Sequence, residues 1–87
     1  MRESEDQKQL RKIIFDIIEN QIRDNDPPET KQTLHRLRAD RYSHEEAMKL
    51  IGCVVTSEIF DVLKQLLPFD PVGYVNALNR LPTLPDE

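Results

Sequence analysis

The chain has 87 residues, of which 38% are hydrophobic and 32% charged, and its formal net charge is -4. This composition is too apolar for a disordered chain, and no apolar run reaches the roughly 20 residues of a membrane span. The acidic balance argues against general nucleic-acid binding. The first nine residues lack the apolar centre of a secretory signal, so we expect a cytoplasmic protein.

Apolar residues recur throughout at spacings of three and four, which is typical of α-helices. Only two glycines occur, and the prolines stand between the periodic segments and not inside them. The sequence therefore predicts an all-α fold, a small array of three main helices and a short C-terminal one. A single domain over residues 1–87 is expected, with flexible or extended ends at 1–4 and 82–87.

A first helix is predicted from Glu5 to Arg23, because Ser4 and Gln7 have the spacing of a capping box. Its apolar residues span an arc of about 200° when projected at 100° per residue. Such an arc is wide for a helix with one neighbour, so two helices cover it or part of it faces another molecule. The arc consists of Leu10, Ile13, Ile14, Phe15, Ile17, Ile18 and Ile22.

The acidic and proline-rich segment 24–29 ends that helix and starts a second, which runs to about Ala39. We expect Asp26 to cap this helix and Pro27 to occupy its first turn. Leu34 and Leu37 are its main apolar anchors. A helix with so few apolar side chains is predicted to lie on the surface.

Ser43 and Glu46 form the clearest capping box in the chain and mark the start of a third helix, which reaches Leu67. Apolar residues nearly encircle its first half, so we interpret it as the central core helix. Gly52 is expected to let another helix approach closely. Cys53, the single cysteine, is interpreted as a small buried hydrophobe.

Pro68 ends the third helix, and Asp70 followed by Pro71 starts a short fourth one that extends to Leu81. Three of its residues are expected in the core, namely Val72, Val75 and Leu78. Tyr74 and Leu81 are placed at its edges. The proline-rich tail cannot continue as helix, and Leu84 is expected to dock against the domain.

Several short segments together resemble a family of short bacterial all-helical proteins classed as a domain of unknown function. These segments are Glu19-Asn20-Gln21, residues 25–29, residues 42–47, Ile51-Gly52 and Pro68-Phe69-Asp70. The resemblance implies histidines where this chain has Phe15 and Lys49, and a glycine where it has Arg41. If family members hold a metal through those histidines, this chain has lost the ligands. The family implies no activity, cofactor or partner.

A carboxylate metal site in a helical bundle needs Glu residues from several helices and Glu-x-x-His pairs. Here Glu46-x-x-Lys49 takes the place of such a pair. A degenerate metal or ligand site would use Asp16, Glu19, His44 and Glu46. We interpret these residues primarily as a solvated polar surface, because carboxylates lie outside unless they are paired.

The second helix carries a basic patch, and Lys31, His35 and Arg38 share one of its faces. The full patch consists of Lys31, His35, Arg36, Arg38 and Arg41. It is interpreted as a solvated face, with binding of phosphate, an acidic partner or nucleic acid as the alternative. A helix-turn-helix is disfavoured, because the third helix is too apolar to enter a DNA groove.

The chain has no glycine-rich phosphate loop, catalytic triad order or cysteine–histidine pair, so no catalytic residue and no cofactor is predicted. The leading hypothesis is a protein-interaction module that buries an apolar helix face against another protein or a second copy of itself. The residues expected in this contact are Phe15, Ile18, Ile22, Ile59, Phe60 and Leu63.

Overall fold

The computed structural model describes residues 5–65 and 68–85. Four helices account for most of them: α1 (Glu5–Asp24), α2 (Pro28–Ala39), α3 (His44–Gln65) and α4 (Pro71–Arg80). These described ranges contain no strand, which confirms the predicted all-α fold. The predicted capping box at Ser4 and the predicted end of the third helix at Leu67 lie outside the described residues.

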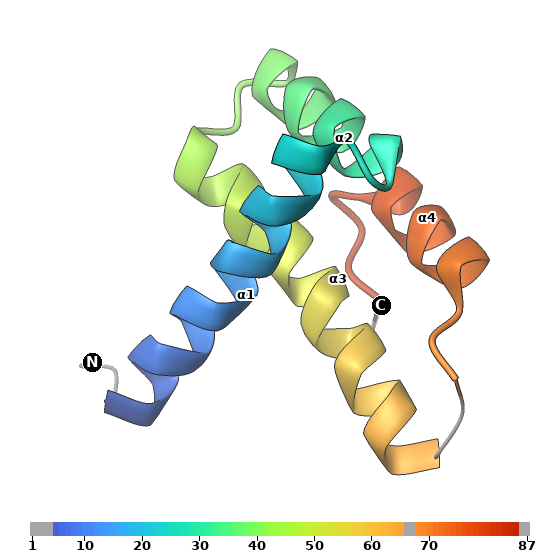
Figure 1. Ribbon diagram of the computed structural model, residues 1–87. Helices are drawn as coiled ribbons and strands as arrows, with labels where there is room; N and C mark the ends of the chain where they lie inside the picture. Colours follow the sequence, from blue (N-terminus) through green and yellow to red (C-terminus); the bar gives the residue numbers. More distant parts are fainter. Residues whose placement is uncertain (1–4, 66–67, 86–87) are drawn as a thin grey trace.

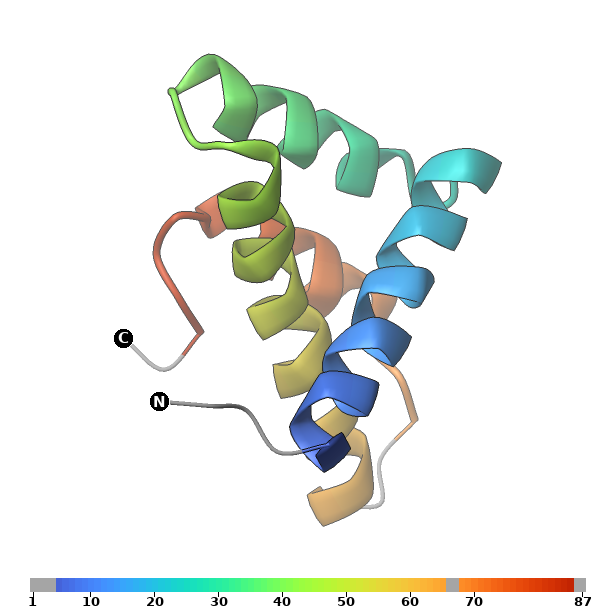
Figure 2. The same ribbon diagram turned by 90° about the vertical axis from the view of Figure 1, so that its left-hand side faces the viewer.

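The helices form an open arrangement in which α2 lies across one end of α1 and α3 (Figures 1 and 2). The α1 and α3 helices run in opposite chain directions and cross, and beyond the crossing the N-terminal end of α1 and the C-terminal end of α3 are separated in Figure 1. The α4 helix packs against α2 and α3. The closed end of the array therefore holds the core.

The core draws residues from all four helices. Ile18, Leu37, Ile51, Val54 and Leu78 are each 0% exposed. The other buried hydrophobic residues are Ile14, Ala47, Met48, Val55, Tyr74 and Leu81. All six buried residues of α3 lie between Ala47 and Val55. The prediction that α3 is the central core helix thus holds for that part of the helix.

The α2 helix is more deeply packed than its sequence predicts, because it contacts α1, α3 and α4. Thr30, Thr33 and Leu37 are buried. Thr30 can be buried at low cost because its hydroxyl donates a hydrogen bond of 2.7 Å to the Gln21 side-chain oxygen. The prediction of a surface helix is therefore wrong for the face that carries these three residues.

Both α1 and α2 end in a left-handed residue. Asn25 has φ 51° and Arg41 has φ 77°. After α2, the Tyr42 N-H donates to the Leu37 carbonyl at 3.1 Å and the Arg41 N-H to the Arg38 carbonyl at 3.1 Å. This is the bonding pattern of a Schellman motif, in which glycine is the residue usually found at the left-handed position. Arg41 thus occupies a left-handed position, and it is the position at which the family resemblance implies a glycine.

The predicted helix starts hold in part. The Glu46 carboxylate accepts a hydrogen bond of 2.8 Å from the Ser43 backbone N-H, and the Ser43 hydroxyl accepts one of 3.0 Å from the Glu46 N-H, which confirms the capping box. At α2 the cap residue is Pro27 and the first helical residue is Pro28, so the assignment of Asp26 as cap is wrong by one residue. Asp70 does precede α4, but without a side-chain capping bond.

The face that α4 buries also differs from the prediction. Tyr74, Leu78 and Leu81 are buried at helical spacing, whereas Val72 is 69% exposed. Tyr74 is drawn inward because its hydroxyl finds a partner on α1, so the helix is rotated relative to the predicted orientation. Leu84 packs against the core as expected.

Gly52 lies where α1 crosses α3. A Cβ atom at this position would lie 3.3 Å from Cγ2 of Ile14 and 3.8 Å from Cε1 of Phe15. The close helix approach predicted from Gly52 is therefore confirmed. The next residue, Cys53, is exposed, and the prediction of a buried thiol is wrong because position 53 turns away from the core toward the open side of this crossing.

Candidate functional site

The diverging halves of α1 and α3 leave apolar side chains uncovered. Leu10 and Ile13 of α1 are 51% and 56% exposed, and Phe60 and Leu63 of α3 are 62% and 67% exposed. Two concave surfaces collect most of the apolar groups in this region, one on each side of the crossing of α1 and α3.

The first surface, here called the α1–α3 groove, has a volume of about 850 Å³. Leu10, Ile14 and Phe15 of α1 face Gly52, Cys53 and Phe60 of α3 across it. Its charged lining residues are Arg11, Lys49, Asp61 and Lys64. Three cations thus accompany one carboxylate, and the groove has a positive balance.

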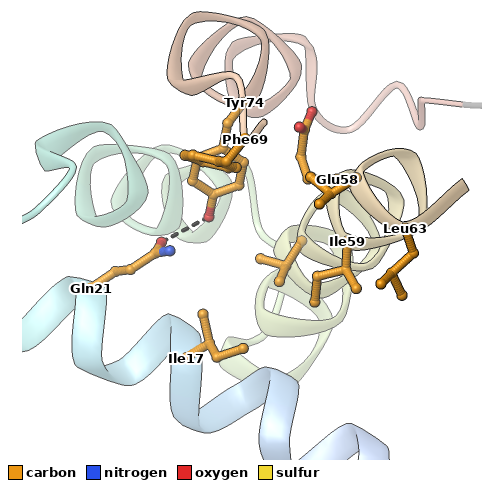
Figure 3. Close-up of a pocket in the computed structure, with 9 residues that line it drawn as sticks. Ile17, Gln21, Glu58, Ile59, Leu63, Phe69 and Tyr74 are labelled. Carbon is orange, nitrogen blue, oxygen red and sulfur yellow. Dashed lines mark hydrogen bonds between the residues drawn. The ribbon is translucent and has the colours of Figure 1, made fainter. Parts of the chain in front are cut away.

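The second surface, here called the three-helix cleft, has a volume of about 310 Å³ and lies between α1, α3 and the start of α4. Figure 3 shows Ile17 and Gln21 of α1 facing Ile59 and Leu63 of α3, with Phe69 and Tyr74 on the third side. The remaining lining residues are Val55, Glu58 and Val62. The Phe69 and Tyr74 rings stack at a centroid distance of 5.8 Å, tilted by 56°.

A polar junction lies at one end of the cleft. The side-chain oxygen of Gln21 accepts a hydrogen bond of 2.8 Å from the Tyr74 hydroxyl, drawn as a dashed line in Figure 3, and another of 2.7 Å from Thr30. Both hydroxyls can donate, so the amide orientation agrees with its surroundings. The junction joins α1, α2 and α4 through a single acceptor atom.

Two residues of the cleft have environments that disfavour their charged forms. Burial raises the pKa of the Tyr74 hydroxyl above its usual range, and the polar interactions of that hydroxyl with Thr30 and Gln21 only partly oppose this shift. Partial burial raises the pKa of Glu58 as well, and the carboxylates of Asp61 and Asp70 add to it by repulsion. Titratable groups shifted in this way are concentrated at functional sites.

The structure divides the predicted contact residues into three groups. Phe15 and Phe60 line the α1–α3 groove, whereas Ile59 and Leu63 line the three-helix cleft. Ile18 is 0% exposed, so its predicted role in a contact surface is wrong, because its own helices cover it completely. Ile22 is half-buried against the core.

The structure does not bring the alternative metal residues together. Across the described part of the chain no group of three His, Cys, Asp or Glu side chains is close enough to hold a metal ion. Asp16 and Glu19 are exposed on α1, while His44 and Glu46 belong to the first turn of α3. Glu46 is committed to the capping box, and the Ser43 hydrogen bonds lower the pKa of its carboxyl.

One residue of the predicted basic patch, Arg36, has a structural role. The Arg36 guanidinium donates hydrogen bonds of 2.8 Å to the Leu81 carbonyl and 3.0 Å to the Leu78 carbonyl, where it caps the C-terminal end of α4. Lys31, His35, Arg38 and Arg41 are exposed. Arg36 is thus a structural residue of the interface between α2 and α4, and the exposed patch consists of the other four.

Sequence reasoning did not identify the three-helix cleft. Gln21 and Tyr74 are 53 positions apart, and no local motif connects them. The available signal was indirect, since a tyrosine and a glutamine within apolar helical faces indicate a buried polar pair.

Comparisons of this chain with protein-family models, with curated proteins and with solved structures found no match. The family resemblance of the sequence therefore stays a prediction. The two positions at which that resemblance implies histidine, Phe15 and Lys49, both line the α1–α3 groove. Over the described residues, no helix combines the length and the apolar character that a bilayer crossing requires.

Proposed function

We propose that this chain is a protein-interaction module that forms a homodimer through the α1–α3 groove. The observation that carries the proposal is Phe60, whose ring is 62% exposed beside a groove with apolar walls. Exposed aromatic rings next to concave apolar surfaces are the usual anchors of protein interfaces. A cytoplasmic location, as the sequence predicts, is part of the proposal.

A second copy of the chain offers a matching apolar surface. In a twofold dimer the same patch faces itself, so that Phe60 of each subunit can enter the groove of the other.

The surface of the protein is large enough for an interface of the usual area. A stable contact covers about 800 Å² on each partner, roughly an eighth of the 6459 Å² surface of this protein. Leu10, Phe15 and Phe60 would contribute the apolar centre, and the charged residues along the groove would form its rim.

Sedimentation equilibrium over a wide range of protein concentrations tests the proposal. We expect a species of twice the subunit mass of 10.2 kDa. Phe60→Asp should convert it to monomer, because a carboxylate cannot be buried in an apolar groove without a partner. Val72→Asp is the matched control, since Val72 is 69% exposed on α4 and lines neither the groove nor the cleft.

A mass of one subunit at every concentration would contradict the homodimer. Equal dissociation of the Phe60→Asp and Val72→Asp variants would place the contact elsewhere. Circular dichroism of both variants, with unchanged helix content, establishes that a loss of association does not arise from unfolding.

A further inference from the structure

We propose that the exposed basic patch of α2, made of Lys31, His35, Arg38 and Arg41, is a docking surface for a short acidic segment of another protein. In such a segment several glutamate or aspartate side chains follow one another closely. This contact is separate from the α1–α3 groove and would add a second partner to the dimer proposed above.

The patch occupies a face of α2 that carries no carboxylate of the same helix. Lys31, His35 and Arg38 fall within an arc of about 60° when projected at 100° per residue. The three buried residues of the helix are centred about 130° away in the same projection, and Glu29 and Asp40 about 160° away. The three basic side chains therefore point away from the core and away from the acidic residues of their own helix.

The four side chains of the patch make none of the ion pairs or side-chain hydrogen bonds found in the part of the chain that the structure describes. Other cations do have partners. The Arg23 guanidinium lies 3.1 Å from the Asp24 carboxylate, and the Lys49 ammonium lies 3.5 Å from that of Glu45. Arg36, on the same helix as the patch, donates to main-chain carbonyls of α4. The patch thus keeps its charges available to a partner.

The patch and the rest of the protein have opposite charge. Lys31, Arg38 and Arg41 supply three positive charges in a chain whose formal net charge is -4, so the remaining residues carry -7. A cluster of one sign on an open surface attracts groups of the other sign and disfavours partners of its own sign. Carboxylates are good partners for it, because an arginine can bind one through two parallel hydrogen bonds.

The size and composition of the patch favour an acidic protein segment over a nucleic acid. Lys31 and Arg38 are about 10 Å apart along the helix axis, which is close to the distance over which salt screens charges. A nucleic acid strand would extend beyond the patch and meet the acidic remainder of the surface. The patch also contains no Phe, Tyr or Trp on which unpaired bases could stack.

Three probes test the site by NMR titration of the full chain at pH 7: blocked peptides of eight glutamates and of eight glutamines, and a single-stranded oligonucleotide of eight thymidylates. The glutamate peptide should shift the amide signals of α2 and Arg41, and the glutamine peptide should not. Raising the salt concentration from about 20 to about 200 mM should weaken the shifts, because exposed charges are screened.

Two results of these titrations would overturn the proposal. One is the absence of shifts in α2 with the glutamate peptide at low salt. The other is tighter binding of the oligonucleotide than of the glutamate peptide, which would make the patch a nucleic-acid surface.

The double variant Lys31→Gln/Arg38→Gln should bind the glutamate peptide about fivefold more weakly, the loss expected for two exposed ion pairs. Lys8→Gln/Lys12→Gln is the matched control, because it removes the same charge from exposed positions of α1. Equal losses in the two double variants would mean that only the net charge matters, which would overturn the assignment to α2.

The docking surface and the dimer can fail independently. None of the four patch residues lines the α1–α3 groove, so Phe60→Asp should bind the glutamate peptide with unchanged affinity even where it abolishes association. Lys31→Gln/Arg38→Gln should in turn sediment like the wild type. Peptide shifts at Lys49 and Lys64 in place of α2 would locate the acidic segment in the groove and overturn the docking proposal.

Discussion

Tyr74 shows how a single hydroxyl orders several parts of this small protein. Its ring is 2% exposed, and its oxygen lies 2.8 Å from the Gln21 side chain on another helix. Because the Gln21 oxygen also accepts from Thr30, loss of the tyrosine hydroxyl would remove one of two donors at a half-buried acceptor. These two hydrogen bonds connect three helices, α1, α2 and α4.

Tyr74→Phe should lower the free energy of unfolding by about 1 kcal/mol at neutral pH, the usual net value of one hydrogen bond. Burial raises the pKa of Tyr74 in the folded protein. The unfolded chain therefore loses this proton first, and the stability provided by the neutral tyrosine falls as pH rises from about 10 to the folded pKa. The difference between the wild type and Tyr74→Phe should shrink over that interval.

Urea denaturation between pH 7 and pH 11 measures this difference. Tyr42→Phe is the control, because Tyr42 is half-buried and its hydroxyl makes none of the hydrogen bonds found among the described residues. A difference that stays constant, or grows with pH, would mean that the Tyr74 hydroxyl is not held in its neutral form by the fold.

Arg41 stands at the position where the family resemblance implies a glycine. A side chain in the left-handed region costs roughly 1 kcal/mol more than glycine, and the turn after α2 requires that region because of its two Schellman hydrogen bonds.

Among the elements, α4 depends most on a contact from outside itself. It has ten residues, which is too short for stability in isolation. Arg36 of α2 donates to the carbonyls of Leu78 and Leu81 at its C-terminal end, where a positive charge also complements the helix dipole. The guanidinium thus takes the place of a C-terminal capping residue.

Arg36→Ala should destabilise the protein by about 1.5–3 kcal/mol, because hydrogen bonds to charged groups are worth that much and two carbonyls lose their donor. The amide protons of α4 should exchange faster in the variant than those of α1 and α3. Urea denaturation and amide hydrogen exchange measure the two effects.

Arg38→Ala provides the comparison, since Arg38 is an exposed arginine two positions along the same helix. Equal losses of stability in Arg36→Ala and Arg38→Ala would show that the hydrogen bonds from Arg36 to the C-terminal end of α4 stabilise the protein no more than an exposed arginine does. Heparin retention separates the roles further: the exposed Arg38 should affect it more than the partly buried Arg36.

At the scale of the whole molecule, the separation of α1 and α3 decides which apolar surface is left for interaction. Gly52 permits the close crossing near Ile14, and beyond that crossing the two helices move apart (Figure 1). Leu10, Ile13 and Phe60 remain exposed on the separated halves. The open end of the array is therefore the part of the protein that association would stabilise.

If association stabilises the folded protein, its melting temperature should rise with protein concentration, because mass action favours the associated state. Phe60→Asp should melt at a temperature independent of concentration. Differential scanning calorimetry over a hundredfold range of dilution measures this. A wild-type melting temperature that does not change with dilution would contradict a reversible dimer in that range.

The capping box at Ser43, the crossing at Gly52 and, within the described residues, the helix boundaries to about one residue were predictable, because each depends on residues close together in the chain or on helical periodicity. Local sequence also indicated that apolar side chains exceed what one short chain covers. Exposed Leu10, Ile13, Phe60 and Leu63 agree with that prediction.

The tertiary structure alone decided which members of each apolar set are buried. Ile18 and Leu10 belong to the same predicted arc, yet one is 0% and the other 51% exposed, because α2, α3 and α4 gather at one end of α1. The roles of Arg36, Gln21 and Tyr74 also depend on partners 42 to 53 positions away. Periodicity specifies the face a helix buries, but helix crossings determine how far along its length that face is covered.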